Sequence, residues 1–462
     1  MFAGMDLRYV MCVLFCAAAL TVSAVLGQNE RSDVYRWTRQ SLPELLVRHT
    51  APVNTPLFIG KEEKEDKGTT ICGIECQSSL PPMDQVKQER ILGYETMYEN
   101  GTRTHTDVSL LGFNMTSGAH TSFHTRRKRQ VYGVDGRFVI SDSHFITNYP
   151  FSAAVRLSTG CSGVLISPKH VLTAARCIHD GKDYLESSRK LKVGVLQLKI
   201  KRGRFGRRRG GRRRSGGEEK AEEQLMEGGE EKNSIDGERG RRGGAGRRHR
   251  GGRGGKEGVT DRFEGRRRKL RTLSRIRRST ETGKQPVFRW TRVKQTRIPQ
   301  GWILSMSSNN SVSSDYNYAL LELRRPVKQR YMELGVAPAA APLTRIHFSG
   351  FDADKSLLDG HGDEKVIYRF CSVAKESNDL MYQHCDAQPG AMGAGVYIRL
   401  RQEEEQKGKW QRRVIGVFAG HQWVDVEGGD EKDFNVAVRI TPLKYAQICQ
   451  WIRGDPSLCK EI

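Results

Sequence analysis

Short runs of alternating apolar and polar residues fill the chain from Ser152 onward. They begin with SAAVRLS and CSGVLIS, which a Thr-Gly pair separates, and continue through LKVGVLQLKI, YALLELRRPV, GVYIRLR and RVIGVFAG. Alternation with a period of two, bounded by turn residues, is typical of half-buried β-strands. Many short strands without helical periodicity predict an all-β fold, built as a sandwich or as barrels.

One helix is predicted near the end of the chain, within PLKYAQICQWIRG. Leu443, Ile448, Cys449 and Ile452 form an apolar stripe at helical spacing, and Gly454 follows as a stop signal. The segment therefore predicts a single amphipathic helix that follows the last strand.

A long apolar run stands at the start of the chain. Arg8 precedes YVMCVLFCAAALTVSAVLG, which ends in small residues and is followed by the polar QNERSD. These features predict a signal peptide at residues 1–27, and a single membrane anchor is the alternative. No second long apolar run follows, so we expect the mature chain to be secreted and extracellular, without a membrane span.

Residues 28–129 differ from the strand-rich part of the chain. They carry mixed charge and little sustained periodicity, and they end in the basic run TRRKR. Because the composition shifts sharply after that run, we predict a prosegment at 28–129, cleaved after Arg129 by a secretory-pathway convertase, and a domain at 130–462. The alternative is that the run is a solvated basic patch.

The strand pattern is interrupted over residues 201–280. This segment holds 28 Lys and Arg against 12 Asp and Glu, a net charge of +16 out of +24 for the chain. Its few apolar side chains cannot offset the entropy of ordering, so we expect a disordered insert within one domain. A long loop adds little closure free energy. The run RIRRS in it offers a second cleavage site at Arg278, with more basic linker as the alternative.

Basic clusters make the insert a candidate for binding heparan sulfate or another sulfated polyanion through charge and counterion release. The clusters are Arg207, Arg208, Arg209, Arg212, Arg213, Arg214, Arg266, Arg267, Arg268 and Lys269. The alternative is a solvated linker whose charge keeps the chain soluble. Nucleic-acid binding is not expected, because only Phe205 and Phe263 interleave the arginines as stacking platforms.

Ten cysteines are present, and Cys12 and Cys16 lie in the predicted signal peptide. The other eight, an even number in an oxidising compartment, favour disulfides. Zinc is the alternative for Cys72 and Cys76 in CGIEC, but no matching second pair or His-x3-His accompanies them, so no metal site is expected. Candidates for N-glycosylation are Asn100, Asn114 and Asn309.

The segment CSGVLISPKHVLTAARC resembles the part of the trypsin-like (chymotrypsin-fold) serine protease family that carries the catalytic histidine. Two cysteines sixteen residues apart, an apolar strand and LTAA all coincide in it. The resemblance implies two six-stranded antiparallel β-barrels with a C-terminal helix. It also implies a Cys161–Cys177 disulfide that clamps the histidine loop. In this chain Arg176 stands in the histidine position.

The family's two other catalytic boxes are altered as well. In DYNYALLEL, Asn317 stands where the family has Asp, and Asp315 could replace it only through a register shift. In PGAMGAG, Met392 falls in the serine position and Ala391 in that of the preceding Asp. The resemblance extends over roughly residues 130–462, apart from the insert.

These substitutions remove the chemistry of the triad, which needs a nucleophilic oxygen, a neutral imidazole and a carboxylate. Arg176 stays cationic and accepts no proton. Met392 has no hydroxyl, and an Asp-to-Asn change alone lowers kcat by about 10⁴ in the well-studied enzymes. His179 lies nearby but supplies no nucleophile. We therefore expect a catalytically inactive homologue that needs no cofactor.

Some of the family's site involves backbone and loops that can persist. The backbone N–H groups of Gly390 and Met392 could form a nest like an oxyanion hole. Asp386 lies where the family places the acid of a basic-specificity pocket, but the local spacing is strained and we interpret it as an ordinary loop acid. In the family, the N-terminus created by cleavage pairs with the Asp before the serine, and Ala391 stands in that position here. Cleavage after Arg129 would thus loosen or release the prosegment without ordering an active site.

The remaining cysteines leave several pairings open. Cys371–Cys385 is the next predicted disulfide. The last four could pair as Cys72–Cys76 and Cys449–Cys459, or could tie the prosegment to the domain.

For function, the sequence predicts a secreted pseudoprotease that acts by binding an unknown protein partner, with the insert as an anchor to sulfated glycosaminoglycans. The alternatives are a polyanion- or matrix-binding protein whose protease fold is only a scaffold, and a residual serine endopeptidase.

Overall fold

The computed structural model describes most of the predicted domain and part of the segment before it. The described residues are 35–36, 41–60 without 55 and 57, 83–112, 136–200 without 141, 284–352 without 305–310, 339–342 and 344, 365–401, 410–426 and 430–459. The predicted signal peptide, Cys72, Cys76, Asn114, Arg129, the insert and Asn309 lie outside these residues. No helix in the described part is long and apolar enough to cross a bilayer.

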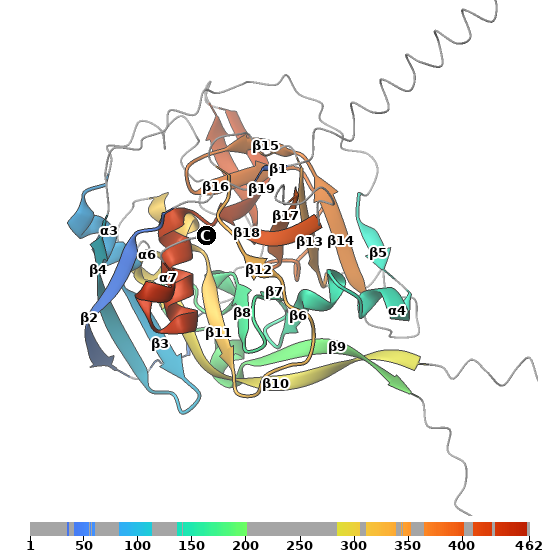
Figure 1. Ribbon diagram of the computed structural model, residues 1–462, viewed down its shortest axis with the longest axis horizontal. Coiled ribbons are helices and arrows are strands. Elements are labelled where there is room, and N and C mark those ends of the chain that lie inside the picture. Colours follow the sequence, from blue (N-terminus) through green and yellow to red (C-terminus); the bar gives the residue numbers. More distant parts are fainter. Residues whose placement is uncertain are drawn as a thin grey trace, which may run out of the picture. The chain divides into compact units, whose positions relative to one another are not determined.

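Two antiparallel sheets dominate the structure, as the period-two pattern predicts (Figure 1). In the first sheet, six strands close into a barrel, because β10 pairs with both β9 and β11. In barrel order these strands are β6 (Ala154–Leu157), β7 (Ser162–Leu165), β8 (His170–Thr173), β11 (Ala319–Leu323), β10 (Lys284–Pro299) and β9 (Lys192–Ile200).

The second sheet forms a half-barrel instead of the second closed barrel that the family resemblance implies. Its order is β15–β16–β19–β18–β17–β13–β14–β5, and no ladder joins β14 to β16 among the described residues. The Cys371–Cys385 disulfide spans that gap. The strands are β5 (Phe138–Ile140), β13 (Ile346–Gly350), β14 (Val366–Cys371), β15 (Val373–Glu376), β16 (Leu380–Gln383), β17 (Gly395–Arg401), β18 (Trp410–Val426) and β19 (Asp430–Arg439), with the short β1 (Tyr35–Arg36) and β12 (Glu333–Leu334) at its margins.

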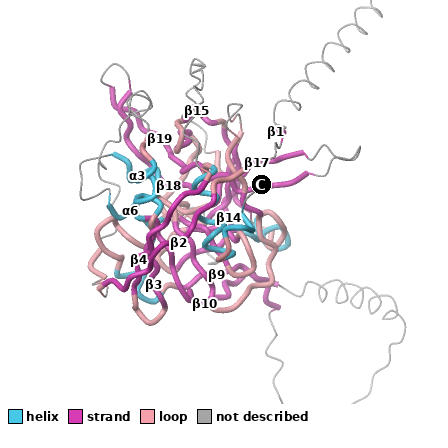
Figure 2. Tube along the Cα trace, turned by 60° about the vertical axis from the view of Figure 1, so that its left-hand side comes forward, coloured by secondary structure: helices cyan, strands magenta, loops and turns pink. Residues whose placement is uncertain are grey.

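Part of the predicted prosegment is built into the first sheet, where we expected few strands. β3 (Tyr94–Tyr98) pairs with β10, and β4 (Arg103–Leu111) and β2 (Glu44–Val53) continue the sheet from there (Figure 2). The sequence pattern missed this extension for a physical reason. A β-bulge between Val47 and His49 interrupts the period-two alternation of β2.

Helices are short and few in the described residues. They are α3 (Gln85–Leu92), α4 (Ser143–Ile146), α6 (Gln300–Leu304) and α7 (Pro442–Arg453), with the 3₁₀ turns η1 (Phe151–Ala153), η2 (Ala175–Cys177), η3 (Glu186–Lys190), η5 (Ser311–Tyr316) and η7 (Pro456–Cys459). The predicted C-terminal helix is confirmed as α7. The Thr441 side chain caps its start, and Gly454 ends it in the left-handed conformation at φ +75°.

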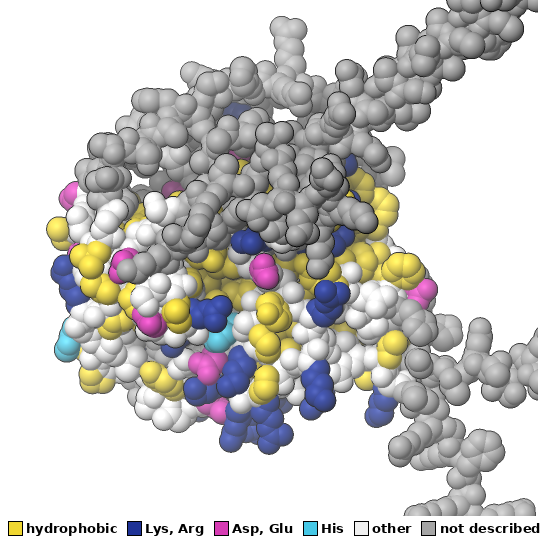
Figure 3. Space-filling model, viewed as in Figure 1, with side chains coloured by type: hydrophobic (Ala, Val, Ile, Leu, Met, Phe, Trp, Pro, Cys, Tyr) yellow, Lys and Arg dark blue, Asp and Glu magenta, His cyan; other side chains and the backbone are white. Residues whose placement is uncertain are grey.

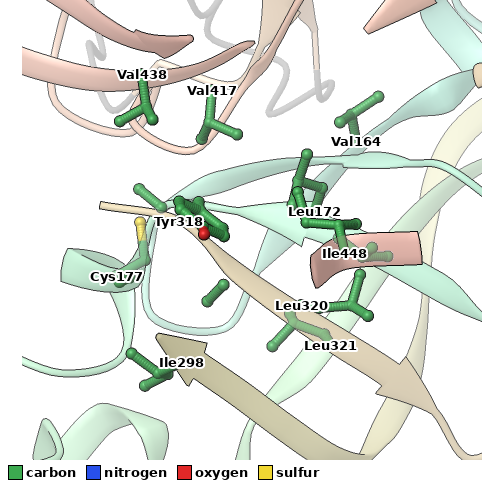
Figure 4. Close-up of a cluster of buried hydrophobic side chains, with 14 of the residues drawn as sticks. Val164, Leu172, Cys177, Ile298, Tyr318, Leu320, Leu321, Val417, Val438 and Ile448 are labelled. Carbon is green, nitrogen blue, oxygen red and sulfur yellow. The ribbon is translucent and has the colours of Figure 1, made fainter. Parts of the chain in front are cut away.

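One hydrophobic cluster joins the two sheets and α7. Figure 4 shows Val417 and Val438 of the half-barrel near Leu172 of the barrel, with Ile448 of α7 beside them. All four of these side chains are essentially buried. Burial of each such side chain contributes roughly 1.5–3 kcal/mol, so this cluster holds the two sheets together.

Candidate functional site

Arg176 lies in the turn that follows β8, where the sequence placed the catalytic base. The Cys161–Cys177 disulfide anchors this turn, as predicted. The Arg176 side chain is half-buried, and that burial lowers the pKa of its guanidinium. Guanidinium nonetheless stays protonated in proteins, so Arg176 places a permanent cation at the end of β8.

Asn317 is brought into direct contact with Arg176. The backbone N–H of Arg176 donates to Asn317 Oδ1 over 2.9 Å, and Asn317 is 1% exposed. Its amide Nδ2 is buried without a hydrogen-bond partner in the described part of the chain. The structure therefore joins two of the three predicted positions through one buried hydrogen bond.

Asp315 could replace Asn317 only through a register shift, and its carboxyl contacts other residues in the structure. Its carboxyl interacts with Asp379 and Lys444, and Lys444 in turn lies 2.7 Å from the Asp379 carboxylate. Burial, reinforced by the charge of Asp379, raises the pKa of Asp315 to about 8. The register that meets Arg176 is thus the one with Asn317, and no register shift occurs.

Met392, the third of the predicted triad positions, lies on the half-barrel side. Its carbonyl oxygen accepts from the backbone N–H of Ser162 over 2.8 Å and lies 3.8 Å from Cys177 Sγ. Its side chain extends to β18, because a Cβ built on Gly420 would lie only 2.9 Å from Met392 Cε. A thioether thus occupies the space between this turn and β18.

The backbone around Met392 keeps two donors available. Ala391 N–H donates to Gln388 and Gly393 N–H to Phe418, but neither Gly390 N–H nor Met392 N–H donates within the described residues. Gly390 and Gly393 have φ values of +102° and +86°, in the left-handed region that glycine adopts readily. The two donors of the predicted nest are present, although no nucleophile stands beside them.

The hydroxyls near Met392 donate to carbonyl oxygens. Ser162 Oγ donates to Gly390 O over 2.6 Å, and Thr173 Oγ1 donates to Ser162 O over 2.8 Å. His179 is buried, its Nδ1 accepts from Gly181 N–H, and burial lowers its pKa to about 4. His179 therefore has a structural role in its own turn.

One Ser–His pair exists elsewhere, at the other end of β8. Ser167 Oγ lies 2.7 Å from His170 Nδ1. Ser167 Oγ also accepts from the backbone N–H groups of Lys169 and His170, so the pair closes the β7–β8 turn. Because β8 spans His170 to Thr173, the turn lies about 10 Å along the strand from the turn of Arg176. This pair is a turn contact outside the candidate site.

Asp386 behaves as a loop acid. It is exposed, and its carboxylate accepts from Gly136 N–H over 2.7 Å. Its carbonyl oxygen accepts from Arg369, a buried arginine that pairs with Asp352. Arg369 could not be recognised from the sequence, because an arginine in a strand ordinarily points to solvent and no motif marks the exception.

Two other predicted features can be compared with the structure. Cys449–Cys459 forms a disulfide that fastens η7 to α7, one of the pairings left open. Asn100 lies exposed in the β3–β4 turn, where its Oδ1 accepts from Thr102 N–H and Oγ1. No group of three or more His, Cys, Asp or Glu in the described part is arranged to hold a metal.

Comparisons with known proteins identify similar chains. A family model described as Trypsin matches residues 139–209. Inactive serine protease 35 of Mus musculus is 45% identical over 444 residues, covering 94% of this chain and 96% of that protein. The protein of the same name from Homo sapiens is 46% identical over 440 residues, covering 94% and 95%. Serine protease 23 of Bos taurus is 40% identical over 428 residues, covering 92% of each chain.

Among solved structures, a Glu endopeptidase in complex with MPD aligns with 71% of this chain and 100% of that chain. Its TM-score is 0.38 and its sequence identity 15%.

Proposed function

This chain belongs to the trypsin-like serine protease family, in the branch of inactive serine protease 35 and serine protease 23, and on this premise we propose that it is a secreted pseudoprotease that acts by binding. The hydrogen bond from Arg176 N–H to Asn317 Oδ1 is the observation that carries the proposal. It places the base and acid positions of the family next to each other, and both are occupied here by residues that cannot perform the proton transfers.

Each of the three chemical roles lacks its group. A serine nucleophile needs a base that accepts its proton, and Arg176 is a permanent donor. The base needs a carboxylate to orient it, and Asn317 presents an amide. Met392 has a thioether with no proton to lose. The remaining donors, Gly390 N–H and Met392 N–H, can bind an oxygen atom but cannot attack a carbonyl.

A fluorophosphonate probe tests the absence of catalysis. We expect no covalent labelling of the purified full-length protein under conditions in which trypsin is fully labelled. A triple variant, Arg176→His with Asn317→Asp and Met392→Ser, serves as the matched control because it restores all three groups on the same scaffold. Serine labelling of the unaltered chain would contradict the proposal.

Secretion is part of the proposal and is supported by the N-terminal apolar run and by the exposed sequon at Asn100. We expect the protein in the medium of expressing cells to carry an N-glycan at Asn100. An Asn100→Gln variant should migrate faster on a gel, and treatment with an N-glycosidase should remove the difference. Retention of the protein inside the cells would argue against this part of the proposal.

Anchoring to sulfated glycosaminoglycans is the second part. Its support is the net charge of +16 in residues 201–280. We define an insert-neutralised variant, in which the ten basic residues of the three named clusters become glutamine while the chain length is kept. The unaltered protein should elute from heparin at higher salt than this variant. Elution at the same salt would contradict anchoring by the insert.

A further inference from the structure

Arginines and aromatic rings alternate along one face of the half-barrel. The Arg/aromatic row consists of Arg412 on β18, Arg399 and Tyr397 on β17, His347 on β13 with Arg345 just before that strand, Tyr368 and Phe370 on β14, and Phe138 on β5. Cross-strand register places these side chains on a common face. The opposed pairs are Arg412 with Arg399, Tyr397 with His347, His347 with Phe370, and Tyr368 with Phe138.

Neighbouring rings of the row touch one another, and those of Phe138 and Phe370 are exposed while His347 and Tyr397 are buried. Phe138 and Phe370 stack with centroids 5.4 Å apart, and they are 47% and 41% exposed. His347 stacks on Tyr397 at 5.4 Å, and Arg345 lies 5.5 Å from the centre of the Phe370 ring. The row therefore combines exposed apolar ring surface with guanidinium groups.

Tyr149 extends the row beside β18. Its ring lies between two cations, with Arg330 at 5.2 Å and Arg412 at 5.6 Å from the ring centre. Burial, together with the negative charge of Glu333, raises the pKa of Tyr149, and the Glu333 carboxylate pairs with Arg413. Glu333, the acid at this end of the row, is thus already paired with Arg413, which is outside the row.

Three arginines at the β17–β18 end of the row are not paired with acids in the part of the chain that the structure describes. Arg330, Arg399 and Arg412 have no carboxylate within ion-pair distance among the residues the structure describes. Arg399 and Arg412 face each other directly across two strands, an arrangement that like charges disfavour. A polyanion bound across both strands would relieve this repulsion.

Lys and Arg side chains gather along the lower edge of the view in Figure 3, with acidic side chains among them. Basic residues of β10 and of the segment after β11 are likewise paired with acids. Arg292 and Arg324 both pair with Glu99, at 3.4 Å and 3.3 Å. Lys294 pairs with Glu322 at 2.9 Å. Positive charge is therefore compensated there, and these residues supply a matched control for the row.

His347 does not add to the charge at neutral pH. Burial, together with the nearby Arg399 and Arg345, lowers its pKa to about 3. Its Nδ1 forms a hydrogen bond with the Tyr368 hydroxyl over 2.8 Å. The positive charge of the row comes from guanidinium groups, which present several donors in a planar fork.

We propose that the Arg/aromatic row binds a linear sulfated polysaccharide, separately from the insert. Guanidinium forks match the paired oxygens of sulfate and carboxylate groups, and exposed rings offer flat contact surfaces for sugar rings. Five strands at about 4.8 Å spacing give the row a length of about 19 Å, which suits a polymer that carries charge along its chain. The inference rests on the extracellular location in the proposed function.

A polysaccharide suits the row better than a single-stranded nucleic acid. Phe138 and Phe370 are stacked on each other at an interplanar angle of 15°, so neither ring has both faces open to a base. Nucleic-acid binding surfaces of this kind depend on rings that are free to stack with successive bases. The Phe138 and Phe370 rings instead pack on each other, and their outer surface is open to a sugar ring.

A full-length double variant, Arg330→Gln with Arg399→Gln, tests the proposal. Both side chains are exposed, and glutamine keeps part of the stem while it removes the charge. The control is Arg292→Gln with Arg324→Gln, which loses the same formal charge at the compensated edge. Affinity for a heparin dodecasaccharide is measured at about 0.15 M NaCl. We expect a loss of about tenfold or more in the row variant and less than about twofold in the control.

The design separates the possible failures. Equal losses in both variants, or no loss in the row variant, would overturn the proposal. Equal binding of fully desulfated heparin would overturn the assignment to sulfate. Tighter binding of an oligothymidylate that the row variant abolishes would replace the polysaccharide by a nucleic acid.

Repeating the pair of variants in the insert-neutralised background distinguishes this inference from the proposed function. A row effect that persists there supports the row even if the insert contributes nothing. If heparin binding is lost with the insert alone, the anchoring proposal stands and the row is rejected. Arg399→Gln by itself replaces the double variant if the latter unfolds at lower temperature than its control.

Discussion

At the scale of single residues, Asn317 shows why the scaffold persists without its chemistry. Its Oδ1 accepts from Arg176 N–H inside the core, so the amide satisfies a backbone donor that would otherwise be buried and unpaired. This role depends on an acceptor oxygen and not on a negative charge. An asparagine can therefore hold the turn of Arg176 in place while it cannot orient a catalytic base.

Removing that acceptor is expected to destabilise the fold. Asn317→Ala should lower the free energy of unfolding by about 1–3 kcal/mol, because it leaves Arg176 N–H unpaired. The exposed Asn378→Ala variant is the control and should change stability by no more than about 0.5 kcal/mol. Urea denaturation of both proteins checks the prediction, and equal midpoints would show that the hydrogen bond contributes nothing.

Asp315 is expected to make stability depend on pH. Its pKa is about 8 in the folded state against 3.8 as the ordinary value, so the native state holds a proton that the unfolded chain has released. Stability should therefore fall as pH rises from the ordinary pKa of an aspartate toward the raised pKa of Asp315. Asp315→Asn should flatten the profile measured by denaturation between pH 5 and 9. A variant with the unchanged slope would contradict this assignment.

At the scale of elements, β18 and the Met392 turn fit each other at Gly420. The strand has a register shift between Phe418 and Gly420, and Gly420 has a φ of +98°. A side chain at this position would meet both an unfavourable backbone conformation and the Met392 methyl group. The absence of a Cβ thus lets the thioether lie against the strand.

A double-mutant cycle separates these two effects. Gly420→Ala should destabilise the unaltered protein by about 2–4 kcal/mol, the sum of the backbone term and overpacking. In a Met392→Ala background the overpacking disappears, and the loss should fall to about 1 kcal/mol. Thermal or urea unfolding of the four proteins gives the coupling. Equal losses in both backgrounds would place the Met392 side chain away from Gly420.

At the scale of the whole molecule, the described part of residues 28–129 belongs to the barrel domain. β3 pairs with β10 over five residues, Tyr94 packs edge-on against Trp451 at 5.3 Å, and Gln88 donates to the Tyr316 hydroxyl over 3.2 Å. Gln447 of α7 also donates to the Leu92 carbonyl. Contacts of this kind persist after a peptide bond between the segments is cut.

We therefore expect cleavage at Arg129 to leave the N-terminal segment bound, contrary to the release or loosening that the sequence alone suggested. A site for a specific protease replaces residues 126–129, and the cut protein is analysed by gel filtration in native buffer. Both pieces should elute together, and then separate in urea or on a non-reducing denaturing gel unless a disulfide joins them. Separate elution in native buffer would show that the segment is a detachable prosegment.

The strands that the sequence analysis predicted correctly are those whose burial follows their own local pattern. β6, β7, β9, β11, β17 and β18 each lie in a short apolar-rich run bounded by turn residues, and α7 carries its stripe and its terminal glycine. The Cys161–Cys177 and Cys371–Cys385 pairs were expected and are present. β2 was missed because its bulge breaks the alternation, and Arg369 was missed because its partner Asp352 lies seventeen residues away with no motif between them.

The sequence by itself determined the chemistry of the candidate site. Residue type alone states that Arg176, Asn317 and Met392 cannot transfer the protons of a triad, since this follows from their functional groups wherever they lie. Only the tertiary structure decided which residues meet. Strand register determines the contact of Asn317 with Arg176 and the position of Met392 against Gly420. It also determines the alignment of the Arg/aromatic row. Register is set by the packing of segments far apart in the chain, which no local pattern records.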